Sequence, residues 1–131
     1  MPWDLAGIAI DSAGITGGTE LTPGVLRRYS ELSRLAARDL GDLAAPIHDA
    51  RRDPASGLVG HAEMVAATEK IRSQFAAWLA PDRRMAVLGG CCTLMIGLGA
   101  ATRDRIGDFG VAYIDGHLDL YDGQSSPSGE G

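Results

Sequence analysis

Three side chains that can bind a metal ion alternate near the end of the sequence: Asp115, His117 and Asp119. They follow an apolar run at residues 111–114, which predicts that a strand ends where these side chains begin. Residues two apart in an extended chain share a face, so all three side chains can point at one place. Two carboxylates and an imidazole form a site suited to Mn²⁺, Mg²⁺ or Zn²⁺. For this pattern alone, a polar loop after a buried strand is an equally good interpretation.

A second segment with possible metal ligands also follows a predicted strand. Residues 84–88 are extended and mostly apolar in pattern, and Gly89 and Gly90 then lead to Cys91 and Cys92. A disulfide between neighbouring cysteines would be strained, so both are expected to be free thiols. Two strands therefore end in side chains that can bind metal, which favours a metal site over a solvated loop.

The elements that must position these side chains alternate between strands and helices. Strands are predicted at residues 7–10, 38–43, 84–88 and 109–114, the last apolar on both faces. Helices are predicted from Thr22, as N-cap, and Pro23 to about residue 37, over residues 61–79, and from Thr93 to about residue 101, ending near Gly107.

This alternation predicts an α/β fold, a three-layer sandwich with a mainly parallel sheet, in a single domain over residues 1–131. In such sheets ligands bind outside the carboxyl ends of the strands. Both candidate segments follow strands directly, so both are expected at that edge.

Composition limits the classes of partner. The chain has 131 residues and a net charge of −5, which disfavours nucleic acid and anionic membranes as main partners. No stretch approaches the roughly 18 to 20 apolar residues of a membrane span, and the first residues do not begin a signal peptide. These observations predict a cytoplasmic protein with free thiols.

Four segments, in this order, resemble motifs of the arginase and agmatinase family, the ureohydrolases. Residues 20–27, Glu-Leu-Thr-Pro-Gly-Val-Leu-Arg, are similar to the family's Gly-Pro-x-x-Leu-Arg helix start, and residues 39–42, Asp-Leu-Gly-Asp, to its Asp-x-Gly-Asp strand. Residues 89–93, Gly-Gly-Cys-Cys-Thr, stand where the family has Gly-Gly-Asp-His-Ser. Residues 115–119, Asp-Gly-His-Leu-Asp, stand where it has Asp-Ala-His-x-Asp. The resemblance implies an arginase-like fold.

The resemblance also implies a cofactor and an activity. Family members use two Mn²⁺ ions, with a bridging hydroxide that attacks the carbon of a guanidinium group. By resemblance, Asp115 would bind both metals, Asp119 the first and His117 the second. Cys92 stands at the family's first histidine ligand, and a thiolate is softer than imidazole and favours Zn²⁺ or Fe²⁺. A buried, inert thiol is the alternative for Cys92, and the favoured interpretation for Cys91.

The loop after these ligands differs from the family pattern. The family's asparagine, which helps hold the substrate carboxylate in arginases, falls at Tyr121, while its serine falls at Ser128. Both are predicted to bind substrate, although a serine in such a loop is often only solvated. Arginine, agmatine and a hydroxyarginine-like compound all stay open as the small guanidino substrate.

The resemblance covers only part of the family's fold. The remaining family ligands come from an Asp-x-Asp motif on a later strand, and no such motif follows Asp122. We therefore expect the N-terminal part of a ureohydrolase, inactive by itself and belonging to a homo-oligomer, a trimer or hexamer as in the family. The alternatives are a non-catalytic ureohydrolase-like protein for binding or assembly, and a thiol-based metal or redox site.

Overall fold

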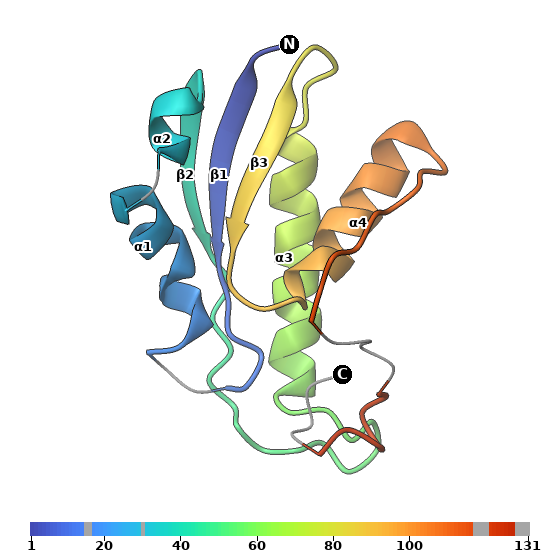
Figure 1. Cartoon of the computed structure of the whole chain (residues 1–131). Coiled ribbons are helices and arrows are strands. Elements are labelled where there is room, and N and C mark those ends of the chain that lie inside the picture. The colour runs from blue at the N-terminus through green and yellow to red at the C-terminus, as the bar shows by residue number, and fades with distance from the viewer. Residues whose placement is uncertain (15–16, 30, 117–120, 128–131) are drawn as a thin grey trace.

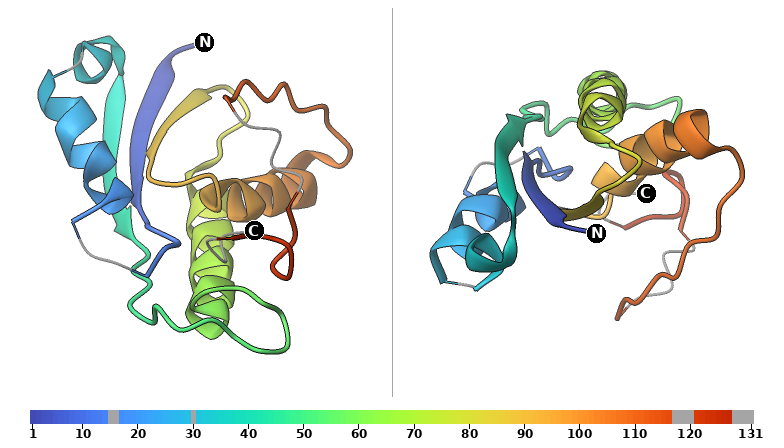
Figure 2. Two further views of the ribbon diagram at one scale, coloured as in Figure 1. Left: turned by 60° about the horizontal axis from the view of Figure 1, so that its bottom comes forward. Right: turned by 90° about the horizontal axis from the view of Figure 1, so that it is seen from above.

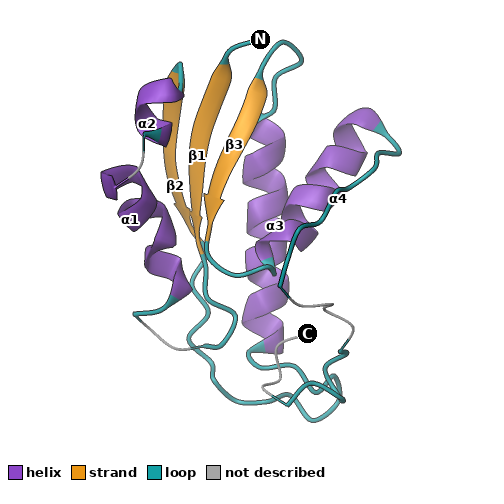
Figure 3. Cartoon of the chain, in the orientation of Figure 1, coloured by secondary structure: helices purple, strands orange, loops and turns teal. Residues whose placement is uncertain are grey.

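The computed structural model describes residues 1–14, 17–29, 31–116 and 121–127, and shows a sheet between two layers of helices (Figures 1 and 3). Helices α1 and α2 cover one face, and α3 and α4 lie on the other, as the view from above shows (Figure 2). The elements in chain order are β1 (Trp3–Ala9), the 3₁₀ helix η1 (Thr19–Leu21), α1 (Thr22–Tyr29), α2 (Leu32–Leu35), β2 (Arg38–Ala44), α3 (His61–Trp78), β3 (Arg84–Gly89) and α4 (Leu94–Ile106).

The sheet has the strand order β2-β1-β3, and both neighbours run parallel to β1. The central strand β1 is buried from Asp4 to Ile8, because it has a strand on either side and helices on both faces. All three carboxyl ends therefore lie at the same edge of the sheet. The predicted α/β class, the three layers and the parallel sheet are confirmed.

The main core lies between the sheet and the layer of α3 and α4. Ile71 and Phe75 on α3 pack with Ile8 of β1 and Leu98 of α4, and all four side chains are buried. Each fully buried large apolar side chain contributes about 1.5–3 kcal/mol to folding. The close approach of the two helices depends on Gly97, where an added Cβ would lie 2.7 Å from the Ile71 side chain.

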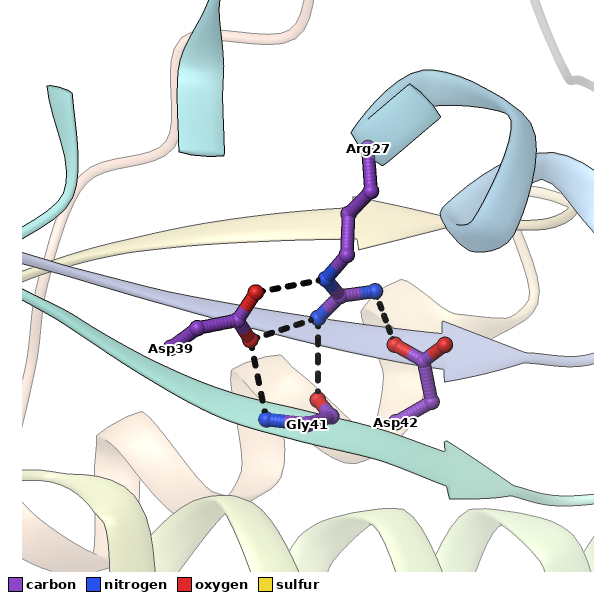
Figure 4. A network of polar contacts seen from close by, with 4 residues as sticks. All are labelled: Arg27, Asp39, Gly41 and Asp42. Carbon is purple, nitrogen blue, oxygen red and sulfur yellow. Dashed lines mark hydrogen bonds and ion pairs between the residues drawn. The ribbon is translucent and has the colours of Figure 1, made fainter. Parts of the chain in front are cut away.

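On the other face, an ion-pair network joins α1 to β2 (Figure 4). The Arg27 guanidinium donates to both carboxylate oxygens of Asp39, at 2.8 and 3.0 Å, and also to Asp42. Asp39 and Asp42 are three residues apart, and a regular strand would place them on opposite faces. The register shifts between Leu5 and Gly7, where one extra β2 residue is accommodated near Gly41, at φ 81°. The bulge thus turns both carboxylates towards α1, and Arg27 lowers the pKa of Asp39.

Two predictions about elements were wrong. Residues 109–114 form no strand: the segment is exposed, with Val111 at 61% and Ile114 at 96%. A strand requires a neighbour that pairs with its backbone groups, and within the described residues the sheet ends at β3. The first predicted helix is also divided into α1 and α2, and Thr22 has helical angles rather than those of an N-cap, because η1 leads directly into α1.

The remaining elements lie near their predicted positions. Strands β2 and β3 and helix α3 match closely, whereas β1 begins at Trp3, four residues before the predicted start, and ends at Ala9. Helix α4 ends at Ile106 and is followed by Gly107, at a φ of 81°. Across the described part of the chain, no helix is both long and apolar enough to cross a membrane.

Candidate metal and substrate site

The carboxyl edge of the sheet is closely packed around the turn that follows β3. An added Cβ at Gly90 would lie 1.9 Å from the carbonyl oxygen of Ile10, in the segment after β1. That segment is itself held by Asp11, whose carboxylate accepts hydrogen bonds from the backbone amides of Ala13 and Thr19, each at 2.9 Å. The segment after β1 and the turn after β3 therefore hold each other in place. The close contact at Gly90 in this way positions Cys91 and Cys92, which follow it.

The two cysteines after Gly90 point to different places. Cys91 is half-buried and packs against the core, whereas Cys92 is exposed. The Cys92 thiol lies 3.8 Å from the Oδ2 atom of Asp115, to which it donates a hydrogen bond. The favoured interpretation of Cys91 as a packed thiol agrees with its position, and Cys92 faces the predicted ligand Asp115.

The segment after α4 brings Asp115 to Cys92 without forming a strand. Gly107 has a φ of 81°, and residues 108–116 are exposed. Phe109 lies beside Gly99 on α4, with its ring 4.0 Å from the position of an added Cβ. Among the described residues, the contact with Cys92 is what places Asp115 at this edge.

The distance between Cys92 and Asp115 fits two ligands of one metal ion. A tetrahedral Zn²⁺ with a bond of about 2.3 Å to sulfur and 2.1 Å to oxygen separates the two ligand atoms by about 3.6 Å. The structure has 3.8 Å between them. His117 and Asp119, the other two predicted ligands, lie outside the described residues. Within the described residues, no group of three His, Cys, Asp or Glu side chains is arranged to hold a metal.

Of the two predicted substrate-binding residues, the structure describes one. Tyr121 is 65% exposed and directly precedes a turn over residues 122–126. The backbone amide of Ser126 donates to the carbonyl of Asp122, which closes this turn. Ser128 lies outside the described residues. Whether either residue binds substrate stays a prediction.

Arg52 holds this turn through a contact that the sequence did not predict. The Arg52 guanidinium, in the connection between β2 and α3, donates to the carbonyl oxygens of Ser126 and Pro127 at 2.7 and 3.2 Å. No local pattern signals it, because the partners are 74 and 75 residues apart in the chain.

A cluster of ion pairs at the opposite edge of the sheet was also not predicted from the sequence. The buried Asp4 carboxylate accepts hydrogen bonds from the guanidinium groups of Arg38 and Arg83, with Nε distances of 3.0 and 2.6 Å. These hydrogen bonds, from Arg38 and then Arg83, hold the pKa of Asp4 well below its ordinary value of 3.8. The cluster ties β1 to β2 and to the segment before β3, and it lies at the edge away from Cys92.

The fold is α/β, with candidate metal ligands at the carboxyl edge of a parallel sheet, and comparison with known proteins shows the family. The chain matches the arginase family over residues 2–131, and it belongs to that family. It is 29% identical to an arginase of Staphylococcus aureus (strain MSSA476) over 119 residues, 86% of this chain and 39% of that protein. It is 27% identical to an arginase of Brevibacillus brevis over 132 residues, 95% of this chain and 43% of that protein.

Solved structures of arginases share the fold. The native arginase of Bacillus caldovelox superposes with a TM-score of 0.77 at 29% identity, covering 98% of this chain and 45% of that one. The arginase of Bacillus subtilis gives a TM-score of 0.76 at 25% identity, covering 99% of this chain and 45% of that one. The chain thus spans less than half the length of the relatives that it matches.

Proposed function

We propose that this chain supplies part of the active site of a metal-dependent hydrolase that cleaves the linear amidine C–N bond of a guanidino compound, releasing urea and an amine. One observation carries the proposal: Cys92 and Asp115, from segments 23 residues apart, meet at the carboxyl edge with their ligand atoms 3.8 Å apart. Membership of the arginase family supports the same chemistry.

Cys92, Asp115, His117 and Asp119 are the residues that would hold the metal. Bound divalent ions supply the positive charge that activates water for attack on a guanidinium carbon. Mn²⁺ is the expected ion from the family, while the Cys92 thiolate favours Zn²⁺ or Fe²⁺. Tyr121 and Ser128 would contact the substrate, for which arginine, agmatine and hydroxyarginine-like compounds are the candidates.

The 131-residue chain alone should bind divalent metal weakly and hydrolyse nothing. The four proposed ligands are only about half of the expected set, and a pair of dications needs further carboxylates to offset four positive charges. Homo-oligomer formation and a cytoplasmic location are part of the proposal, by analogy with the family. A non-catalytic role in binding or assembly is the second candidate, favoured by Cys92 at the position of a family histidine.

A urea-release assay tests the proposal. A family-length polypeptide that carries residues 1–131 is incubated with Mn²⁺ or Zn²⁺ and with arginine, agmatine or hydroxyarginine. We expect urea from at least one compound, and its loss in Asp115→Ala. The matched control is Asp108→Ala, because the Asp108 side chain is 99% exposed on the same segment. Absence of urea with every metal and compound would refute the hydrolase and leave the binding or assembly role.

A further inference from the structure

Two surface turns, far apart in sequence, interlock, and the second includes Tyr121, a residue predicted to bind substrate. The first covers residues 51–60 between β2 and α3, and the second covers residues 121–127, which begin with Tyr121. Figure 1 shows them side by side below α3. The Gln124 side-chain amide donates to the Ala55 carbonyl at 3.1 Å, so the turns share a contact besides those of Arg52.

The first turn has extensive internal hydrogen bonding. Arg52 and Val59 form an isolated antiparallel bridge, and the amide of Asp53 donates to the carbonyl of Leu58 at 2.8 Å. The Asp53 carboxylate accepts hydrogen bonds from the Ser56 amide at 2.7 Å and from the Ser56 hydroxyl at 2.8 Å, which lower its pKa. The backbone of this turn is therefore fixed independently of the second turn.

This turn is also anchored to helix α3. The Glu63 carboxylate, in the first turn of α3, accepts hydrogen bonds from the amides of His48 and Asp49 at 2.5 and 2.9 Å. The Gly60 amide donates to the Arg51 carbonyl at 3.0 Å, where α3 begins. Because α3 packs on the sheet through the core, residues 51–60 are tied to the rigid part of the fold.

The contact between the two turns leaves no room for extra atoms. An added Cβ at Gly57, where φ is 75°, would lie 2.3 Å from the carbonyl oxygen of Gly123. An added Cβ at Gly123 would lie 2.4 Å from the carbonyl oxygen of Ser56. Ser126 is only 3% exposed although it lies in a surface turn. Such close backbone contact fixes the relative position of the turns.

Arg52 provides the charged part of this contact. Its guanidinium donates to two successive carbonyls, Ser126 and Pro127, and charge-assisted hydrogen bonds are the stronger kind. Among the described residues, Arg52 forms no ion pair with a carboxylate, whereas the neighbouring Arg51 is paired with Asp49. Both hydrogen bonds come from the same Arg52 nitrogen, Nη2, so an ammonium group that reached the same place could replace part of the contact.

We propose that Arg52 is a positioning residue for the substrate: it holds the turn of residues 121–127 against the β2–α3 connection, and so sets how tightly the site takes the carboxylate end of a guanidino amino acid. This inference rests on the proposed function, because Tyr121 stands where family arginases place a residue for that carboxylate. Arg52, which is not a metal ligand, would thus affect the affinity for substrate rather than the chemical step.

Two measurements test the role of Arg52. In the first, amide hydrogen exchange of Gln124, Ser125 and Ser126 is followed in the 131-residue chain. Arg52→Ala should speed exchange at these amides by about tenfold, the equivalent of one charged hydrogen bond. Arg52→Lys should restore part of the protection. Arg51→Ala is the matched control, since its side chain is 89% exposed, and it should leave exchange unchanged. Unchanged exchange in Arg52→Ala would overturn the proposed clamp.

In the second, KM and kcat are measured for arginine and agmatine with the family-length polypeptide. Arg52→Ala should raise KM for arginine by about tenfold, with kcat within about twofold, because uniform binding is lost. KM for agmatine, which lacks the carboxylate, should not change. Faster exchange with an unchanged KM for arginine would overturn the role in substrate affinity while the hydrolase stands. A wild-type polypeptide that releases no urea would refute the proposed function and this role together, and the exchange result would still decide the clamp.

Discussion

Gly90→Ala should destabilise the protein, because the turn before the cysteines has no room for a side chain. An ideal Cβ at this position lies 1.9 Å from the carbonyl oxygen of Ile10, and real Cβ atoms essentially never approach within 3.0 Å. The difference of about 1.1 Å must come from movement of the backbone, since the colliding atom is not a flexible side chain. The carbonyl oxygen of Thr19 lies 3.1 Å away and limits movement there as well.

The cost follows from close packing. Extra atoms forced into a well-packed region typically cost about 1–3 kcal/mol. We therefore expect the free energy of unfolding to fall by about 1–3 kcal/mol in Gly90→Ala. Gly110→Ala is the matched control, since no atom lies within 4 Å of its added Cβ, and its change should stay within about 0.5 kcal/mol.

Urea unfolding at pH 7, followed by tryptophan fluorescence, measures both variants against the natural sequence. Trp78 packs against the main core, so its emission reports on the loss of tertiary structure. A lower midpoint with an unchanged m-value indicates a change in stability alone. If Gly90→Ala unfolds at the same urea concentration as Gly110→Ala, the turn can move freely, and the close packing inferred around Gly90 is wrong.

Two further predictions concern the metal site and the response to acid. Cys92→His should shift metal preference from Zn²⁺ towards Mn²⁺ in a family-length polypeptide, because imidazole is a harder ligand than thiolate. Elemental analysis of the metal retained by each protein checks this, and equal metal content would show that Cys92 is not a metal ligand. Asp4 has a folded pKa below its ordinary value of 3.8, so its stabilising contribution is complete above about pH 4 and is lost as pH falls below that value. Asp4→Asn should therefore have a lower free energy of unfolding than the natural sequence at pH 7. Urea unfolding at several pH values should show the difference in free energy of unfolding between the two proteins narrowing below pH 4. A difference that stays constant with pH would contradict the role of the Asp4 charge.

The sequence by itself determined the elements whose signals are local. The apolar runs that became β1 and β3, the helical periodicity of α3 and the Gly107 stop after α4 all lie within short windows of sequence. Side-chain period and turn chemistry act over a few residues, so these features can be read without knowing the partners of each segment. The four motifs that carry the resemblance to the arginase family are equally local.

Tertiary structure decided how distant segments pair. The apolar residues 109–114 were predicted as a strand, but β-propensity requires a neighbouring strand to take effect. The segment is instead exposed and unpaired with the sheet. Only the bulge at Gly41 places Asp39 and Asp42 on one face for Arg27. The contact of Arg52 with residues 126 and 127 depends on where two turns meet in space, because its hydrogen bonds span 74 and 75 residues of sequence. Local sequence patterns carry no information about such contacts until the parallel sheet has brought the segments together.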